Sequence, residues 1–148
     1  DNCRFAQYTL RMLFDEKSNI SDADVIHWNN GLWDVCELFG DGIFTPEEFY
    51  VDTMLRIAKI LKGITSNVIF ATITPVHPDH PHNDNQKIKR LNDLLVPKLK
   101  DLGIVINDLI ALAIQDIPKY VCEDLIHPTQ EGAKLYAEQV VKAIKQFN

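Results

Sequence analysis

Asp124 and His127 are the residues whose types and spacing are best suited to chemistry. They stand three positions apart in the stretch D-L-I-H-P-T (124–129), just before a long amphipathic segment. In a tight turn the carboxylate can accept a hydrogen bond from one imidazole nitrogen, which leaves the other nitrogen basic. Such a pair is the acid and base part of a Ser-His-Asp triad. The alternative is that Asp124 caps a helix and His127 is a polar surface residue, because D-x-x-H is common by chance.

A second group with possible chemistry is the turn N-N-G (29–31), which ends a short apolar stretch. The amide of Asn29 or Asn30 could donate a hydrogen bond to a developing oxyanion, although turn formation alone also explains the pattern. Trp33 follows, and it could form a wall for a sugar or acyl group, although core packing is the default for tryptophan. Thr74 stands at the end of the next apolar stretch, and we expect it at the same rim.

The segment V-H-P-D-H-P-H-N-D-N (76–85) has the residue types of a metal site. Its candidate ligands are His77, Asp79, His80, His82 and Asp84. Their spacing is irregular and two prolines interrupt it, so we favour a solvated loop that borders the site and expect no metal. His27 lies within an apolar stretch, and there a histidine is more often a core residue with a hydrogen-bond partner than a ligand.

A nucleophile is missing from this set. The serines are Ser18, Ser21 and Ser66, and each precedes an expected strand instead of following one. A nucleophile at a strand-to-helix elbow needs the opposite position. Cys36 is the remaining candidate, and no motif surrounds it.

Composition and charge exclude several classes of partner. The chain has 148 residues, with fifteen basic and twenty-one acidic side chains and a net charge of -6. The sequence contains no basic stripe, so nucleic acid is not expected as a partner. It also contains no apolar run near the roughly 20 residues of a membrane span. Its three cysteines are widely spaced and form no CxxC pair, which indicates free thiols in a reducing cytoplasm.

Hydrophobic periodicity predicts alternating helices and strands in a single domain over residues 1–148. Thr45 is expected to cap the second helix, with Pro46 at its first position and Glu48 closing a capping box. Pro97 should kink or interrupt the third helix. We expect strands at 24–29, 67–74 and 104–106, and helices at 1–17, 46–62, 86–102, 109–115 and 129–147.

This alternation is typical of an α/β fold with a parallel sheet and helices on both faces. Parallel sheets bind ligands at the carboxyl ends of their strands, where the asparagine turn, Thr74 and the segment leading to His127 all fall. Three short strands bury little apolar surface for so many helices. We therefore expect that strands preceding Asp1 are absent from this sequence. The first strand should then have an open edge that binds the absent segment or another chain.

At these residues the chain resembles the SGNH (GDSL-type) hydrolases. D-L-I-H-P-T (124–129) is similar to the family's last block, D-x-x-H. N-N-G-L-W-D (29–34) resembles a variant N-x-G-L-x-D form of the third block, where the common form is G-x-N-D. The strand from Val68 to Thr74, with the later helix around Asn92, resembles the family's fourth strand and the segment after it. The family's G-D-S block, which carries the serine, does not occur here.

The resemblance implies a flavodoxin-like three-layer α/β/α fold without its first two strands, about 40 residues judged from the length of a βα unit plus a strand. It implies a serine esterase or acylhydrolase that acts on a small ester, such as a carbohydrate O-acetyl group, without a cofactor. His127 would be the general base, Asp124 would orient it, and Asn29, favoured over Asn30, would help hold the oxyanion. The serine would come from the absent segment, so this chain alone should be inactive. The alternative is a non-catalytic flavodoxin-like module that binds a small molecule or a protein.

Overall fold

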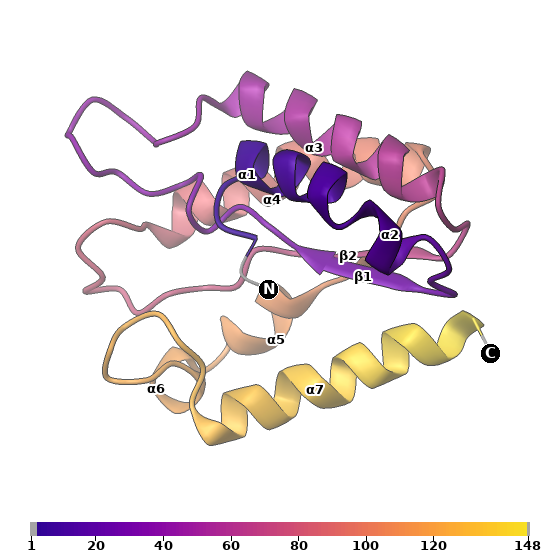
Figure 1. Cartoon of the computed structure of the whole chain (residues 1–148). Coiled ribbons are helices and arrows are strands. Elements are labelled where there is room, and N and C mark those ends of the chain that lie inside the picture. The colour runs from indigo at the N-terminus through magenta and orange to yellow at the C-terminus, as the bar shows by residue number, and fades with distance from the viewer. Residues whose placement is uncertain (1–2, 148) are drawn as a thin grey trace.

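The chain folds into helices on both sides of a small parallel sheet (Figure 1). The structure is a computed structural model, and it describes residues 3–147. Its strands are β1 (Ile26–Asn29), β2 (Val68–Ala71) and β3 (Val105–Asn107). Its α-helices are α1 (Ala6–Asp15), α2 (Lys17–Ile20), α3 (Glu47–Lys62), α4 (Asn85–Asp101), α5 (Leu109–Ala113), α6 (Ile117–Tyr120) and α7 (Gln130–Ile144), and a 3-10 turn follows at Lys145–Phe147.

The three described strands run parallel in the order β1-β2-β3. Trp28 of β1 is in register with Phe70 of β2, and Phe70 is in register with Ile106 of β3. Within the described residues, β1 therefore has a neighbouring strand on one side only. This open edge agrees with the expectation from the sequence.

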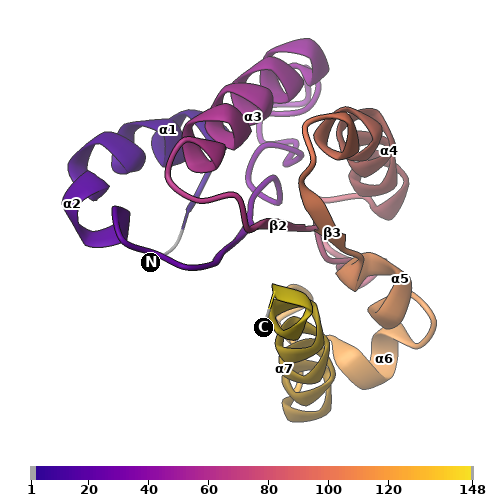
Figure 2. The same ribbon diagram turned by 90° about the vertical axis from the view of Figure 1, so that its right-hand side faces the viewer.

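The helices form two layers around the sheet (Figure 2). Helices α1, α3 and α4 lie on one face, and α5, α6 and α7 lie on the other. Every residue of β2 is buried, as expected for a central strand covered on both faces. The rings of Trp28 and Phe70 pack with centroids 4.8 Å apart, beneath the buried face of α3. Within the described part of the chain, no helix combines the length and the apolar character needed to cross a membrane.

The predicted Thr45 cap is wrong, and Pro97 does not interrupt its helix. The Thr45 hydroxyl donates to Asp34 Oδ1 (2.7 Å), and helix α3 begins at Glu47 without the predicted capping box. A buried carboxylate competes better for the hydroxyl than an exposed helix end does. Pro97 lies inside α4 without ending it. Pro97 and Asp93, whose carbonyl loses a donor, both face solvent, so water can replace the lost bond.

Other elements begin or end differently from the prediction. Strands β1 and β2 are shorter than expected, and β3 is shifted by one residue. Helix α4 starts one residue earlier because Asp84 accepts hydrogen bonds from the amides of Gln86 and Lys87. Helix α6 occupies a segment that we expected to be irregular. The first predicted helix begins at Ala6, and residues 1 and 2 of that prediction lie outside the described residues.

The buried face of α7 is only partly the one that the helical period predicts, which consists of Ala133, Tyr136, Val140, Val141 and Ile144. The structure leaves Ala133 and Val141 exposed, and Val141 is 49 % accessible. Ala137 is exposed as well, so small and apolar residues recur at i, i+4 and i+8 on the outer side of the helix. The apolar residues of α7 therefore lie on two faces of the helix, and the described elements cover only one of these faces.

Candidate active site

Asp124 and His127 lie at the tip of a short hairpin that is closed at its base. Val121 and Pro128 form an antiparallel bridge, and the Cys122 amide donates to the His127 carbonyl (2.7 Å). Thr129 anchors the end of the hairpin, because its hydroxyl donates to the Lys119 carbonyl (2.7 Å) and accepts from the Gly132 amide (3.0 Å) at the start of α7. The residues at 121–129 therefore form a tied segment, which we call the dyad hairpin.

Gly132 allows the dyad hairpin to sit close against α7. A Cβ atom at this position would lie 2.3 Å from the Tyr120 carbonyl oxygen and 3.2 Å from Pro128 Cβ. Both neighbours belong to the base of the hairpin, and the first is a backbone atom that cannot swing away. The glycine is therefore needed for close approach, although a helix interior ordinarily favours alanine.

Within the hairpin, the Asp124 carboxylate holds both the backbone and the ring of the histidine. Its Oδ1 accepts from the Ile126 amide (3.1 Å) and the His127 amide (2.9 Å), and its Oδ2 lies 2.7 Å from His127 Nδ1. Leu125 adopts a φ of 71°, in the left-handed region that an L side chain rarely occupies. This bend lets one carboxylate reach three donors within a span of four residues.

The pair is exposed and electrostatically polarised. The side chain of His127 is 75 % accessible and that of Asp124 is 51 % accessible. The amides of His127 and Ile126, followed by the His127 ring, lower the pKa of Asp124 to about 2. Asp124 is therefore ionised near neutral pH. Because Nδ1 faces this carboxylate, Nε2 is the ring nitrogen left for proton transfer.

The turn after β1 contains both asparagines, but it places them differently. Asn30 is 2 % exposed, its Oδ1 accepts from the Thr9 hydroxyl (2.6 Å), and its Nδ2 donates to the Arg4 carbonyl (2.8 Å). Asn29 is exposed at the carboxyl end of β1, and its Nδ2 donates to the carbonyls of Ala71 (2.9 Å) and Thr72 (3.0 Å). Asn30 thus ties α1 to the sheet, and Asn29 is the more accessible amide.

Gly31 explains why this turn can be so compact. Its φ is +129°, and a Cβ atom there would lie 2.5 Å from Ile73 Cδ1 and 2.6 Å from the Tyr50 hydroxyl. The Tyr50 hydroxyl donates to the Asn30 carbonyl (3.0 Å) in the same place. The turn is therefore packed into the core, and of its two asparagines only Asn29 is exposed.

Asp34 is a residue whose role the sequence analysis missed. It is fully buried, and both of its carboxylate oxygens accept from the Ala6 amide at the start of α1 (3.1 Å each). The Thr45 hydroxyl adds a third bond, and burial raises the pKa of the carboxyl above its usual 3.8. The aspartate of N-N-G-L-W-D was visible in the sequence, but no local pattern there reveals that it caps a helix 28 residues earlier.

The remaining residues that the sequence singled out are Trp33, Thr74 and His27. Trp33 is 51 % exposed on the loop after β1, as a substrate-facing wall requires, and Thr74 is partly buried beyond β2. His27 is partly buried, and its Nε2 lies 3.0 Å from Asn107 Nδ2 across the sheet, which fits a core histidine.

The histidine-rich segment 76–85 is held by its own hydrogen bonds. Among the described residues, no three histidine, cysteine, aspartate or glutamate side chains come together as metal ligands. His80 Nδ1 instead accepts from the amides of His82 (3.2 Å) and Asn83 (3.0 Å). We call this segment the histidine loop.

The nucleophile candidates of this chain are poorly placed. Ser18 lies in α2, Ser21 donates to the Ser18 carbonyl, and Ser66 precedes β2, so all three stand away from the carboxyl ends of the strands. Cys36 is buried, and its thiol donates to Asn83 Oδ1 (2.9 Å). Burial raises the pKa of this thiol, which disfavours the reactive thiolate.

Three loops at the carboxyl ends of the strands are joined by hydrogen bonds. The loop after β1, the histidine loop and the dyad hairpin all lie at the same end of the molecule (Figure 1). The Glu37 amide donates to the His82 carbonyl (2.7 Å), and the His77 amide donates to the Leu125 carbonyl (2.9 Å). The histidine loop is thus the middle member, in contact with both neighbours.

Comparison with known proteins identifies the fold. No family model matches the sequence, and no curated protein matches it. Solved structures do: a lipase/acylhydrolase from Enterococcus faecalis superposes with a TM-score of 0.79 at 18 % identity, over 96 % of this chain and 71 % of its own. A GDSL-like lipase from Bacteroides thetaiotaomicron gives 0.73 at 22 % identity, over 96 % and 71 %. An acetylxylan esterase from Geobacillus stearothermophilus gives 0.74 at 13 % identity, over 95 % and 67 %.

At these identities the likeness concerns the fold, and it confirms the α/β architecture expected from the sequence. The match spans nearly all of this chain and about seven-tenths of the Enterococcus and Bacteroides enzymes. The chain therefore has the fold of the GDSL-type (SGNH) lipases and acylhydrolases.

Proposed function

We propose that this chain is the larger part of an SGNH-type ester hydrolase. The observation that carries the proposal is the exposed His127 ring, fixed by Asp124 at 2.7 Å, at the end of the sheet where the strand-end loops meet. The same carboxylate also accepts from the His127 amide, so the ring and the backbone of the proposed base are held together. The fold shared with lipases and esterases supports the same activity.

In the proposed reaction, a serine hydroxyl attacks the ester carbonyl while His127 Nε2 removes its proton. The ionised Asp124 stabilises the imidazolium that forms, and an amide donor stabilises the negative carbonyl oxygen. His127 then returns the proton to the alcohol as it leaves. Water repeats the sequence on the acyl-serine, which releases the acid and restores the serine.

Asn29 is the asparagine that we assign to the oxyanion. It is exposed at the carboxyl end of β1, whereas the Asn30 amide is buried and bonded on both sides. Both Asn29 Nδ2 bonds go to backbone carbonyls, so one must be exchanged when the oxyanion forms.

The serine is assigned to a segment that precedes Asp1 in the gene product. Two surfaces support this assignment: the open edge of β1 and the exposed face of α7 that carries Ala133, Ala137 and Val141. A strand paired with β1, followed by a helix packed on α7, would cover both. The structural relatives also extend beyond the part matched by this chain.

A carbohydrate O-acetyl ester is our proposed substrate. Trp33 is exposed beside the asparagine turn, and an indole face suits the apolar face of a sugar ring. Three of the similar structures, from two different proteins, are acetylxylan esterases.

Hydrolysis of p-nitrophenyl acetate tests the proposal. The gene product that includes the preceding segment should hydrolyse the ester, and the 148-residue chain alone should not. If the short chain hydrolyses it and His127→Ala abolishes that activity, the assignment of the serine to a preceding segment is wrong. If the long product is inactive toward p-nitrophenyl and sugar acetates alike, the flavodoxin-like binding module is the better account.

A further inference from the structure

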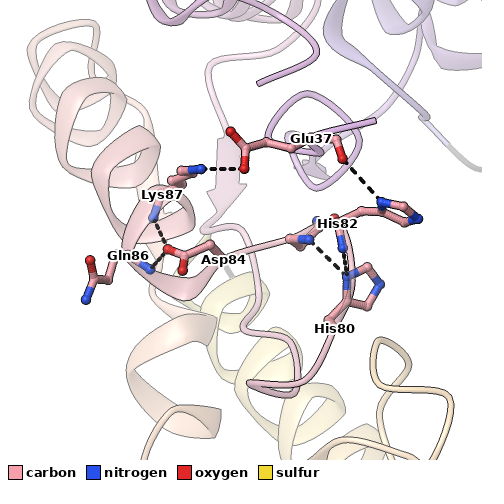
Figure 3. Close-up of polar contacts among 7 residues, drawn as sticks. Glu37, His80, His82, Asp84, Gln86 and Lys87 are labelled. Atoms are coloured by element: carbon pink, nitrogen blue, oxygen red, sulfur yellow. Dashed lines mark hydrogen bonds and ion pairs between the residues drawn. The ribbon is translucent and has the colours of Figure 1, made fainter. Parts of the chain in front are cut away.

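The histidine loop lies between the dyad hairpin and the loop after β1, and it forms backbone hydrogen bonds with both. The ring of His80 forms hydrogen bonds within the histidine loop. His80 Nδ1 accepts from the backbone amides of His82 (3.2 Å) and Asn83 (3.0 Å), and the His80 amide donates to the His77 carbonyl (3.0 Å). Figure 3 shows the ring folded back onto the backbone of the loop. His80 therefore joins two parts of the loop, because its backbone amide bonds His77 and its ring bonds the amides of His82 and Asn83.

Each end of the loop is attached to a different part of the site. On one side the His77 amide donates to the carbonyl of Leu125, the strained residue between Asp124 and His127. On the other side, Asn83 Nδ2 donates to the Leu32 carbonyl (2.9 Å) and Asp84 caps α4. His80 thus stands between the dyad hairpin and the two elements that anchor the far end of the histidine loop, which are the loop after β1 and α4.

Glu37 strengthens the anchored side. Its carboxylate lies 2.6 Å from Lys87 Nζ on α4, and its carbonyl lies 3.2 Å from His82 Nδ1 (Figure 3). The loop after β1, the first turn of α4 and the far end of the histidine loop therefore form one bonded unit. The near end of the histidine loop is anchored too, because Asn85 accepts from the Val76 amide (3.0 Å) and donates to the Val76 carbonyl (2.8 Å). A change in the contacts of the His80 ring therefore acts on the stretch between these anchors, and His77 in that stretch bonds the dyad hairpin.

We propose that neutral His80 is a positioning residue, which holds the histidine loop in the shape that supports the Asp124–His127 turn. The inference rests on the proposed function, because it concerns the supply of a base to that reaction. An imidazolium carries a proton on Nδ1 and cannot accept from two amides. Protonation of His80 therefore breaks both bonds, and acid releases the support of the hairpin.

The surrounding charges agree with this direction. Burial, and then the neighbouring His82, lower the pKa of His80 from its ordinary 6.5, and the charge of Asp124 acts in the opposite direction. Because the folded state disfavours the protonated ring, the loop is fully supported above about pH 6.5 and loses support as the pH falls below it. His82 differs, because its Nδ1 faces the Glu37 carbonyl and so acts as a donor, not as an acceptor.

Substitution of His80 by asparagine keeps a hydrogen-bond acceptor at this position and removes the titrating ring. In His80→Asn, the side-chain oxygen can replace Nδ1 as acceptor, and it does not titrate. His80→Ala removes the acceptor at every pH. His82→Ala is the matched control, because it keeps the backbone amide at position 82 that His80 uses.

The test is amide hydrogen exchange in the ¹⁵N-labelled gene product, corrected for intrinsic rates, at residues 77, 82 and 83. We expect protection in the unmodified protein to fall about tenfold between pH 7.5 and pH 5, the loss that two hydrogen bonds predict. Protection should stay high in His80→Asn at both pH values, be low in His80→Ala at both, and follow the unmodified protein in His82→Ala. Equal protection in His80→Ala and the unmodified protein would overturn the inference.

A second measurement connects the loop to catalysis. The acid limb of kcat/KM should be steeper in the unmodified protein than in His80→Asn, because protonation of His80 adds a loss that the asparagine does not undergo. An unchanged limb in His80→Asn contradicts the positioning role. If exchange follows the prediction while no ester is hydrolysed, the proposed function fails and the structural role of His80 remains.

Discussion

The turn after β1 and the dyad hairpin both place a carboxylate and amide-rich backbone at the carboxyl end of the sheet, but they use these groups in opposite ways. Asp34 is fully buried, and its oxygens are taken up by Ala6 and Thr45. Asp124 is half exposed, and it holds a ring that is 75 % accessible. One carboxylate joins helices, and the other presents a base.

Burial explains the difference in the titration of these two carboxyls. Desolvation raises the pKa of Asp34, although three hydrogen bonds oppose it. Asp124 has little desolvation to overcome, and its backbone and ring partners lower its pKa to about 2. A polar cluster at a strand end is therefore a candidate for chemistry only when its hydrogen bonds leave one reactive atom exposed.

The largest expected effect is a loss of activity, and it should follow from a change in the dyad hairpin. His127→Ala in the complete gene product should lower kcat/KM toward p-nitrophenyl acetate by about 10³-fold or more, because it removes the general base. Its melting temperature should remain close to that of the unmodified protein, since the ring is largely exposed. A loss of less than about tenfold would mean that His127 is not the base.

The next effect separates the two regions by stability. Asp34→Ala should lower the free energy of unfolding by about 2–4 kcal/mol, because it leaves the Ala6 amide and the Thr45 hydroxyl buried without their acceptor. Urea denaturation measures the change. The matched control is Asp124→Asn, which should leave the denaturation midpoint nearly unchanged while it reduces activity. Equal midpoints for the two variants would remove the distinction between them.

A smaller effect tests how the dyad hairpin is attached. Gly132→Ala should lower the free energy of unfolding by about 1–3 kcal/mol, because the new methyl group overlaps the Tyr120 carbonyl. Ala133→Gly, at the neighbouring exposed position, should cost only about 0.5–1 kcal/mol through helix propensity. A stabilised Gly132→Ala protein would show that the hairpin does not depend on this close approach.

The smallest effect is the acid dependence of the hairpin itself. The pKa of Asp124 lies below the ordinary 3.8, so its contribution is complete above that pH and is lost as the pH falls through about 2. The His127 amide resonance should shift over that range in the unmodified protein, and it should lose this transition in Asp124→Asn. A transition centred near the ordinary value would mean that the amide bonds of Asp124 do not persist in solution.

The local parts of the site could be predicted from the sequence. D-x-x-H supplied a carboxylate and an imidazole within one turn, and the structure brings them to 2.7 Å. The helical and strand periods placed the main elements, because those periods follow from the repeat of the backbone. Gly31 marked a turn that only glycine fits.

The non-local parts could not be predicted. Thr45 looks like a helix cap in its own segment, and only the fold brings Asp34 within 2.7 Å of its hydroxyl. The histidine loop has the residue types of a metal site, but backbone amides occupy the His80 acceptor. In both places a partner distant in the sequence, or the backbone, decided which hydrogen bond formed.

The central claim is that His127 serves a serine supplied from outside residues 3–147. The most direct measurement is labelling of the complete gene product with a fluorophosphonate, followed by mass analysis of the modified peptide. The account predicts a single modified serine that precedes Asp1, with labelling strongly slowed in His127→Ala. Labelling of a residue within this chain, or labelling that is indifferent to His127, would contradict it.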